Sequence, residues 1–218
     1  LYVLENNGVY GLTKGQFSAS TDVGSTARKG GAVNQQPPID AVLTAINFGC
    51  TFVARGFSGD KQSLVPLLKA AILHPGFAML DVLSPCVTFN DHEGSTKSYA
   101  YTRESERTTV YADFIPSREP IETDLIKDVT TVTLHDGSRI ALRKVDDDYN
   151  PFDAGAATAY IRDHQEQGEI VTGLLYMDEE AQDLHAMNNT PTTPLNALEP
   201  SKLIPGAAKL AALQKAWR

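Results

Sequence analysis

The chain has little cysteine, little tryptophan and a deficit of positive charge. Its 218 residues include two cysteines and one tryptophan, and 19 lysines and arginines stand against 27 aspartates and glutamates. Two cysteines are too few for a secreted disulfide scaffold, so we expect a reducing, cytoplasmic location. The formal net charge of −8 disfavours nucleic acid or an anionic membrane surface as the main partner.

Long hydrophobic runs are also missing. No stretch approaches the roughly 18 apolar residues of a membrane span, and none resembles a secretory leader. No Gly-x-Ser-x-Gly motif occurs, so a serine hydrolase has no local support. Apolar residues make up 42% of the chain and charged residues 21%, which is ordinary globular usage. A chain of this size can bury enough surface to fold without a disulfide or metal.

The first half alternates between strand and helix patterns. Apolar runs at 1–5, 51–54 and 77–83 are typical of strands, and helical spacing follows Asp40 and Asp60. Strands separated by helices indicate a parallel sheet with right-handed crossovers, and therefore an α/β fold. The opening run has the pattern of a buried parallel strand. Because such a strand needs neighbours, we expect the chain to begin inside a domain, with material lost upstream.

The second half has a different character. We expect residues 1–110 to form the sheet domain and residues 111–218 an α+β extension wrapped on it. The elements expected there are a hairpin over 129–145 with Gly137 at its turn, a helix over 154–167, a strand over 170–177 and a final helix within 202–217.

Chemistry is concentrated in the segment that follows the first strand, Glu5–Gln16. Ligands of open parallel sheets bind where the carboxyl ends of strands meet loops. The amide oxygen of Asn7 and the main-chain carbonyl of Val9 can present two oxygens to one Mg²⁺, which is commonly shared with phosphate. The glycines permit close approach to a diphosphate, and Thr13 and Lys14 add a hydroxyl and a cation. Alternatively, Asn-Gly is a simple turn and Lys14 a solvated loop residue.

Residues 7–16, NGVYGLTKGQ, carry a family resemblance. They are similar to the thiamine-diphosphate loop in the β subunit of 2-oxoacid:ferredoxin oxidoreductases, particularly the 2-oxoglutarate-type or broad-specificity branch. The resemblance continues through Phe17-Ser18, 38–40, 84–90 (SPCVTFN) and 171–176. It implies the diphosphate half of a parallel-sheet thiamine-diphosphate-binding domain, followed by a C-terminal extension.

The activity implied by the resemblance is a coenzyme A-dependent oxidative decarboxylation. A 2-oxoacid, here expected to be 2-oxoglutarate, would yield acyl-CoA and CO₂, and a [4Fe–4S] cluster would pass the electrons to ferredoxin. Thiamine diphosphate, Mg²⁺ and the cluster would be the cofactors. The β subunit would be active only with its α subunit, which would supply much of the substrate pocket.

The resemblance also assigns roles within the loop. Asn7 would bind Mg²⁺ through its side chain and Val9 through its carbonyl oxygen. Leu12 stands where pyruvate-specific relatives tend to carry Asn, and Lys14 would lie beside the active site and favour anionic groups. We take these two as the catalytic candidates, with ordinary packing as the alternative for Leu12. The residues expected to contact the cofactor are Asn6, Asn7, Gly8, Val9, Tyr10, Gly11, Leu12 and Thr13.

Cys86 resembles the last cysteine ligand of the family's [4Fe–4S] cluster. A cubane cluster normally takes four thiolates, whereas Cys50 lies at an apolar helix–strand junction and is better interpreted as a core thiol. In the family, the other three ligands and an aspartate ligand of Mg²⁺ come from a segment upstream of the loop. That segment is absent from this sequence, which we interpret as N-terminal truncation. The five histidines have no metal-site spacing, and we interpret them as structural.

Two other functions remain open. A non-redox thiamine-diphosphate decarboxylase or synthase would also use a strand followed by an Asn-Gly loop, but it would give Cys86 no role. A non-catalytic interaction subunit would keep the fold alone. If the full-length protein is the redox enzyme, it should carry the three missing cysteines and a Gly-Asp-Gly motif, with the aspartate ligand of Mg²⁺, upstream of this sequence. The absence of both would rule out the redox enzyme.

Overall fold

The computed structural model describes residues 1–27, 31–115, 129–134, 136–146, 148–204 and 206–217. These residues divide into two compact units, Leu1–Ala181 and Gln182–Arg218. The first unit holds the sheet and the core, and the second is a helical segment. The predicted site lies in the first unit.

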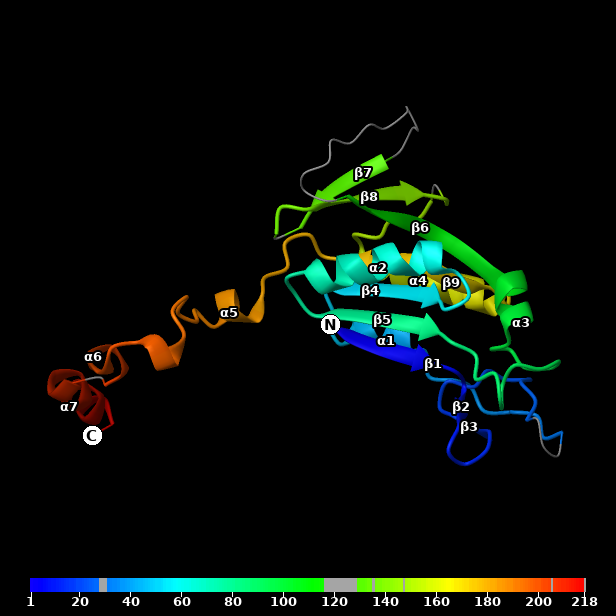
Figure 1. Cartoon of the computed structure of the whole chain (residues 1–218), viewed down its shortest axis with the longest axis horizontal. Coiled ribbons are helices and arrows are strands. Elements are labelled where there is room, and N and C mark those ends of the chain that lie inside the picture. Colours follow the sequence, from blue (N-terminus) through cyan, green and yellow to red (C-terminus); the bar gives the residue numbers. More distant parts are fainter. Residues whose placement is uncertain (28–30, 116–128, 135, 147, 205, 218) are drawn as a thin grey trace. The chain divides into compact units, whose positions relative to one another are not determined.

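A seven-stranded sheet organises the first unit, in the order β1-β5-β4-β9-β6-β8-β7 (Figure 1). Its first three strands are parallel, as the sequence predicts. The sheet then becomes mixed, because β9 runs antiparallel to β4 and parallel to β6, and β7 and β8 form an antiparallel hairpin. The strands are β1 Tyr2–Asn6, β4 Phe52–Phe57, β5 Ala78–Leu83, β6 Glu106–Ile115, β7 Val129–Thr133, β8 Arg139–Lys144 and β9 Ile170–Met177.

Helices cover both faces of the sheet, α2 on one side and α1 and α4 on the other (Figure 1). Each begins at an aspartate that accepts hydrogen bonds from the first turn, Asp40 before α1, Asp60 before α2 and Asp153 before α4. The helices of this unit are α1 Ala41–Asn47, α2 Lys61–Leu73, α3 Tyr99–Ser105 and α4 Ala154–Glu166. The predicted α/β fold with a parallel-sheet core is therefore confirmed.

Two features of the sheet differ from the sequence interpretation. The expectation that the opening strand is buried was wrong, because β1 is an edge strand paired only with β5 among the described strands, and Tyr2 is 55% exposed. The long strand β6, Glu106–Ile115, is not among the elements that the sequence predicts. The first compact unit extends to Ala181, because β9, which belongs to the expected extension, lies between β4 and β6 in the sheet.

The second unit consists of short helices whose described residues are mostly exposed. Its elements are α5 Leu184–Met187, a 3₁₀ turn over Leu195–Ala197, α6 Pro200–Leu203 and α7 Gly206–Ala216. The helix expected within 202–217 is thus present, and it begins at Gly206. Among the described residues of the whole chain, no helix is long and apolar enough to cross a membrane.

Gly173 lies where β9 passes close to the backbone of β6. Its φ is +97°, and a Cβ there would lie 2.5 Å from the carbonyl oxygen of Val110. Gly137 has a similar φ of +80° but nothing within 4 Å. We predict that Gly173→Ala lowers the free energy of unfolding by roughly 3 kcal/mol or more, whereas Gly137→Ala costs about 1–2 kcal/mol. Urea unfolding measures both variants, and equal losses would contradict the close approach of β6 and β9.

Candidate functional site

The candidate cofactor loop begins at the carboxyl end of β1, where the polypeptide leaves the sheet. A two-residue strand, β2 (Val9–Tyr10), pairs with β3 (Gln16–Phe17) and closes the loop as a small hairpin. Asn6, Gly8 and Val9 are buried. The side-chain oxygen of Asn7 accepts a hydrogen bond from the Val9 N–H at 3.0 Å. The segment Asn6–Val9 is therefore a packed, hydrogen-bonded turn, and we call it the cofactor turn.

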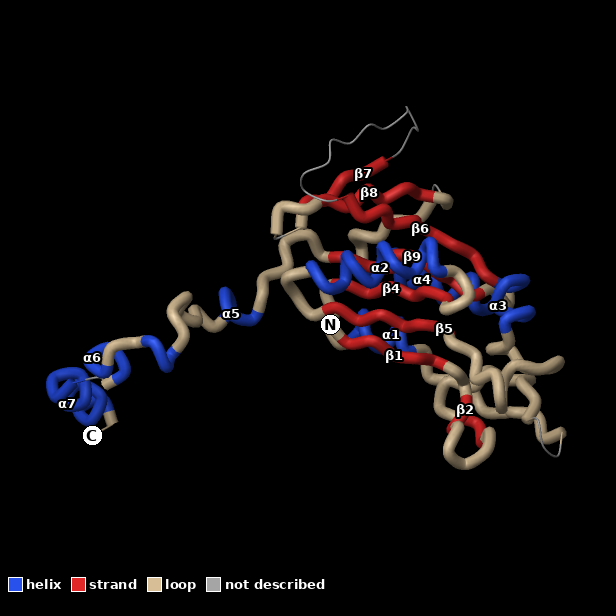
Figure 2. Tube along the Cα trace, in the orientation of Figure 1, coloured by secondary structure: helices blue, strands red, loops and turns tan. Residues whose placement is uncertain are grey.

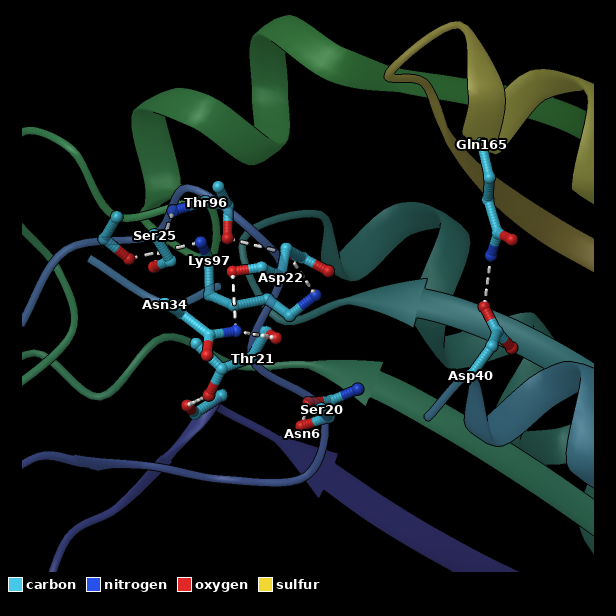
Figure 3. Close-up of polar contacts among 12 residues, drawn as sticks. Asn6, Ser20, Thr21, Asp22, Ser25, Asn34, Asp40, Thr96, Lys97 and Gln165 are labelled. Carbon is cyan, nitrogen blue, oxygen red and sulfur yellow. Dashed lines mark hydrogen bonds and ion pairs between the residues drawn. The ribbon is translucent and has the colours of Figure 1, made fainter. Parts of the chain in front are cut away.

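Side chains from other loops hydrogen-bond to the cofactor turn, and Figure 2 shows loops gathered around β2. Asn90 donates from Nδ2 to the Asn7 carbonyl oxygen at 2.7 Å. The Thr21 hydroxyl donates to the Gly8 carbonyl oxygen. The Ser20 hydroxyl donates to Asn6 Oδ1 at 2.7 Å, and Figure 3 shows the two side chains side by side. External donors thus hold the turn from three sides.

Gly8 is the point where these loops come closest to the turn. Its φ is +70°, and a Cβ there would lie 2.9 Å from Lys97 Cγ and 3.1 Å from Asn90 Nδ2. Lys97 is 8% exposed, and its ammonium forms an ion pair with Asp22 at 2.9 Å. The same carboxylate accepts from the Thr96 hydroxyl at 2.7 Å (Figure 3). Only glycine fits this turn without displacing its surroundings.

The tip of the loop differs from its base. Leu12 is 99% exposed and Tyr10 56% exposed. Lys14 has a φ of +68° and is also exposed. The Thr13 hydroxyl donates to the Tyr10 carbonyl within the tip. The structure therefore brings Asn6, Asn7, Gly8 and Val9 together in the turn, whereas residues 10–14 are exposed apart from the half-buried Gly11.

The cofactor turn fits the two oxygen ligands predicted for Mg²⁺. The Ser18 N–H donates to the Gly8 carbonyl at 3.3 Å, so Gly8 and Ser18 form a hydrogen-bonded pair. The adjacent pair, Val9 and Phe17, is then of the non-hydrogen-bonded kind, and the Val9 carbonyl points away from β3. The Asn7 amide oxygen accepts one hydrogen bond and keeps a second lone pair. Both predicted ligand oxygens thus lie on one hydrogen-bonded turn.

The two cysteines lie at opposite ends of the sheet. Cys86 is half-buried in a turn after the carboxyl end of β5, where its carbonyl accepts from Phe89 N–H and Asn90 N–H. Cys50 is 4% exposed before the amino end of β4, and burial raises the pKa of its thiol. Because β4 and β5 are parallel and six residues long, a strand length separates the cysteines. Among the described residues, no three His, Cys, Asp or Glu side chains gather as a metal site.

A pocket of about 510 Å³ lies beside the cofactor turn, over the carboxyl ends of β1, β4 and β5. Asn6 is the one predicted site residue that lines it, together with Ser20 and Lys97. The buried guanidinium of Arg55 reaches it from β4. The pocket therefore joins the predicted loop to charged groups that the sequence interpretation had not included.

Arg55 is the centre of a buried ionic network. Its Nε donates to Asp81 Oδ2 at 2.8 Å on the neighbouring strand, and its Nη2 donates to Asp40 Oδ2 at 2.9 Å. Gln165 of α4 also donates to Asp40 (Figure 3). Burial opposes ionisation of Asp40, but Arg55 and the Leu43 N–H outweigh it, and the pKa of Asp40 is lowered. The network ties α1 and α4 to the two central parallel strands.

The residues missed by the sequence interpretation left partial signals. Arg55 and Asp81 are charged residues inside otherwise apolar runs, FVARGF and AMLDVL. Opposite charges within two buried strands predict an ion pair if the strands are neighbours. Asn90 belongs to the motif SPCVTFN, in which the sequence analysis assigned a role to Cys86 alone. Lys97 lies in a polar segment for which the sequence analysis predicted no element, and nothing in its local pattern indicates burial.

Comparison with known proteins agrees with this geometry. Residues 1–82 match the family model described as thiamine pyrophosphate enzyme, C-terminal TPP binding domain. A 2-oxoacid:ferredoxin oxidoreductase subunit beta of Saccharolobus solfataricus is 42% identical over 120 residues, which are 55% of this chain and 37% of the relative. Subunit beta of an oxidoreductase of the same name from Aeropyrum pernix is 40% identical over 127 residues, 58% of this chain and 37% of the relative.

Over the matched region the chain is therefore similar to β subunits of 2-oxoacid:ferredoxin oxidoreductases. Its matched region spans little more than a third of the length of these curated relatives. The 2-oxoglutarate oxidoreductase subunit KorB of Mycobacterium tuberculosis is 37% identical over 89 residues, 41% of this chain and 24% of that protein.

A solved structure supports the fold over nearly the whole chain. It is a 2-oxoglutarate:ferredoxin oxidoreductase from Magnetococcus marinus with 2-oxoglutarate, coenzyme A and succinyl-CoA bound. The similarity has a TM-score of 0.60 and 24% identity, and it covers 97% of this chain and 57% of that one. At this identity the likeness shows the fold alone.

The Arg55 network predicts a large and pH-dependent stability effect. Arg55→Met leaves the buried carboxylate of Asp81 and the half-buried carboxylate of Asp40 without their cation, and we expect a loss of about 3–5 kcal/mol in the free energy of unfolding. Arg143→Met, on an exposed position of β8, is the control and should cost less than about 1 kcal/mol. Denaturant unfolding at neutral pH measures both.

The pH profile gives the sign of the carboxylate contribution. Because the pKa of Asp40 is lowered from 3.8, its ion pair stabilises the fold above that value, and the stability is lost as the pH falls through the lowered pKa. We expect the stability of Arg55→Met to depend less steeply on pH below about 5 than that of the unaltered chain. Parallel profiles would contradict the ionic role of Asp40.

Proposed function

We propose that this chain is the diphosphate-binding part of the β subunit of a 2-oxoacid:ferredoxin oxidoreductase. It would bind thiamine diphosphate and Mg²⁺ and take part in the coenzyme A-dependent oxidative decarboxylation of a 2-oxoacid to acyl-CoA and CO₂. The observation that carries the proposal is the cofactor turn, where Asn7 and Val9 present two oxygens at the carboxyl end of a parallel strand.

The roles of the loop residues follow from their positions. Asn7 Oδ1 and the Val9 carbonyl would bind the metal, and Asn6 and Gly8 would hold the turn against the diphosphate. Gly11 has nothing within 4 Å of a Cβ position, so a cofactor can approach its backbone closely. Tyr10 and Thr13 would line the cofactor from the exposed tip. When bound, thiamine diphosphate supplies the nucleophile and electron sink for decarboxylation.

The proposed substrate is 2-oxoglutarate. Leu12 and Lys14 lie on the exposed tip, where a partner subunit could enclose them, and Lys14 would attract the second carboxylate of a dianionic acid. The relatives include proteins named 2-oxoglutarate oxidoreductase and 2-oxoglutarate synthase subunits. We therefore place the chain among enzymes of larger 2-oxoacids, with the α subunit supplying the remainder of the pocket.

Electron transfer is the second part of the proposal. Cys86 would be one thiolate ligand of a [4Fe–4S] cluster that passes electrons to ferredoxin, the other ligands coming from outside this chain segment. Its half-buried position after β5 and its link through Asn90 to the cofactor turn support this role. We propose a cytoplasmic complex, consistent with two free cysteines.

The function is tested with the native complex of this subunit and its α subunit, purified without oxygen. We expect dye reduction that requires thiamine diphosphate, Mg²⁺ and coenzyme A, and that is faster with 2-oxoglutarate than with pyruvate. A colourless complex without such activity would contradict the proposed function. Equal rates with the two acids would contradict the substrate alone.

The cysteines provide a matched pair for the cluster. Cys86→Ser removes a proposed ligand, and we expect the broad absorbance near 400 nm of the native complex to fall by at least half. Cys50→Ser changes a buried thiol at the opposite end of the sheet and should keep the absorbance. Iron analysis of both purified variants checks the result. Retention of the full iron content by Cys86→Ser would remove Cys86 from the ligand set.

A further inference from the structure

Asn90 is buried, and both the nitrogen and the oxygen of its side-chain amide are hydrogen-bonded. It is 2% exposed. Its Nδ2 donates to the Asn7 carbonyl at 2.7 Å, and its Oδ1 accepts from the Ser95 hydroxyl at 2.8 Å. Because the Asn7 carbonyl can only accept, the orientation of the amide follows from its partners. Ser95 is itself fixed, since its oxygen accepts the Lys97 N–H at 3.2 Å.

The main chain of Asn90 belongs to the turn that carries Cys86. Its N–H donates to the Cys86 carbonyl at 2.7 Å. One residue thus binds the carbonyl of Asn7 with its side chain and the carbonyl of Cys86 with its backbone. These contacts join two segments that lie 83 residues apart in the sequence.

The bond to Asn7 restricts the proposed metal ligands in particular. Asn7 can rotate its side chain and its peptide group independently, but the Val9 N–H holds the side-chain oxygen and Asn90 holds the carbonyl. A Mg²⁺ site demands oxygens in near-octahedral positions, so pre-ordering of the ligand residue raises its affinity. Loss of the Asn90 donor would free the Asn7 peptide to turn.

We propose that Asn90 is the positioning residue of the metal site, holding Asn7 in its ligand geometry from the turn that presents Cys86. The proposal rests on the proposed function, because it needs a metal on the cofactor turn. Asn90 is not one of the proposed metal ligands, since its amide nitrogen donates to the Asn7 carbonyl. Its effect is therefore on metal affinity, beyond any general contribution to folding.

The test measures metal binding directly in the native complex. Metal-free complex is titrated with Mn²⁺ at a fixed, saturating concentration of thiamine diphosphate. The concentration of free Mn²⁺ is measured by electron paramagnetic resonance. Mn²⁺ is used because it favours the same oxygen ligands as Mg²⁺. Asn90→Leu keeps the volume and removes the donor, and Asn90→Ala removes both. We expect each variant to bind Mn²⁺ roughly fivefold to tenfold more weakly, the effect of one lost hydrogen bond.

Tyr149→Phe is the matched structural control. Tyr149 is 1% exposed, and its hydroxyl donates to the Leu175 carbonyl at 2.5 Å, remote from the cofactor turn. Its loss should lower the melting temperature in the manner of the Asn90 variants and leave Mn²⁺ affinity unchanged. If the Asn90 variants fail to assemble, Ser95→Ala keeps the donor but releases the amide, and it should weaken Mn²⁺ binding about twofold.

The outcomes separate the two proposals. If the unaltered complex binds no Mn²⁺ with thiamine diphosphate, the proposed function fails. If the unaltered complex binds Mn²⁺ and the Asn90 variants, or Ser95→Ala in their place, bind it equally well, the positioning role fails and the proposed function stands. Weaker binding by Tyr149→Phe to the same degree would also overturn the positioning role.

Discussion

The hydrogen bond from Asn90 to the Asn7 carbonyl is the contact on which the candidate site depends. β1 and β5 are parallel neighbours, so their carboxyl ends deliver the cofactor turn and the Cys86 turn to the same edge of the sheet. The side chain of Asn90 then closes the gap between them at 2.7 Å. Topology brings the two segments together, and one buried amide sets their geometry.

The Arg55 network supplies the rigid base beneath this edge. Removing a guanidinium and its carboxylate partners from water costs desolvation free energy. The ion pairs of Arg55 with Asp40 and Asp81 offset that cost only if all three groups remain in place. The network links β4, β5 and the start of α1 on the side of the pocket that Asn6 also lines. Ion pairs thus hold the residues at the base of the pocket, whereas hydrogen bonds between uncharged groups hold the cofactor turn.

The sequence predicted the parallel core because its strands are continuous apolar runs bounded by clear signals, such as Asp40 and Asp60 as helix caps. The predicted cofactor segment was Glu5–Gln16, and in the structure its base, Asn6–Val9, is packed and hydrogen-bonded. The sequence could not place β9 between β4 and β6, because strand order depends on long-range pairing that a local pattern does not encode. It predicted no strand at β6, since polar residues such as Thr108 and Thr109 occupy the first half of that strand.

The burial of polar side chains was the feature of the structure that the sequence predicted least completely. Asn90, Lys97 and Thr21 lie in polar segments, and composition alone assigns such segments to the surface. Their burial follows from the way the loops pack around Gly8, which no spacing rule reports. Leu12 and Lys14 on the tip are exposed in this chain, but their proposed environment includes a second subunit. Their surroundings therefore do not follow from this chain alone.

A density map of the native complex with thiamine diphosphate and Mn²⁺ in place of Mg²⁺ tests the central claim most directly, through the anomalous signal of the metal. The account predicts one metal peak at about 2.0–2.3 Å from both Asn7 Oδ1 and the Val9 carbonyl oxygen, with Asn90 still bonded to the Asn7 carbonyl. A metal–diphosphate pair bound elsewhere, with the cofactor turn unliganded, would contradict it.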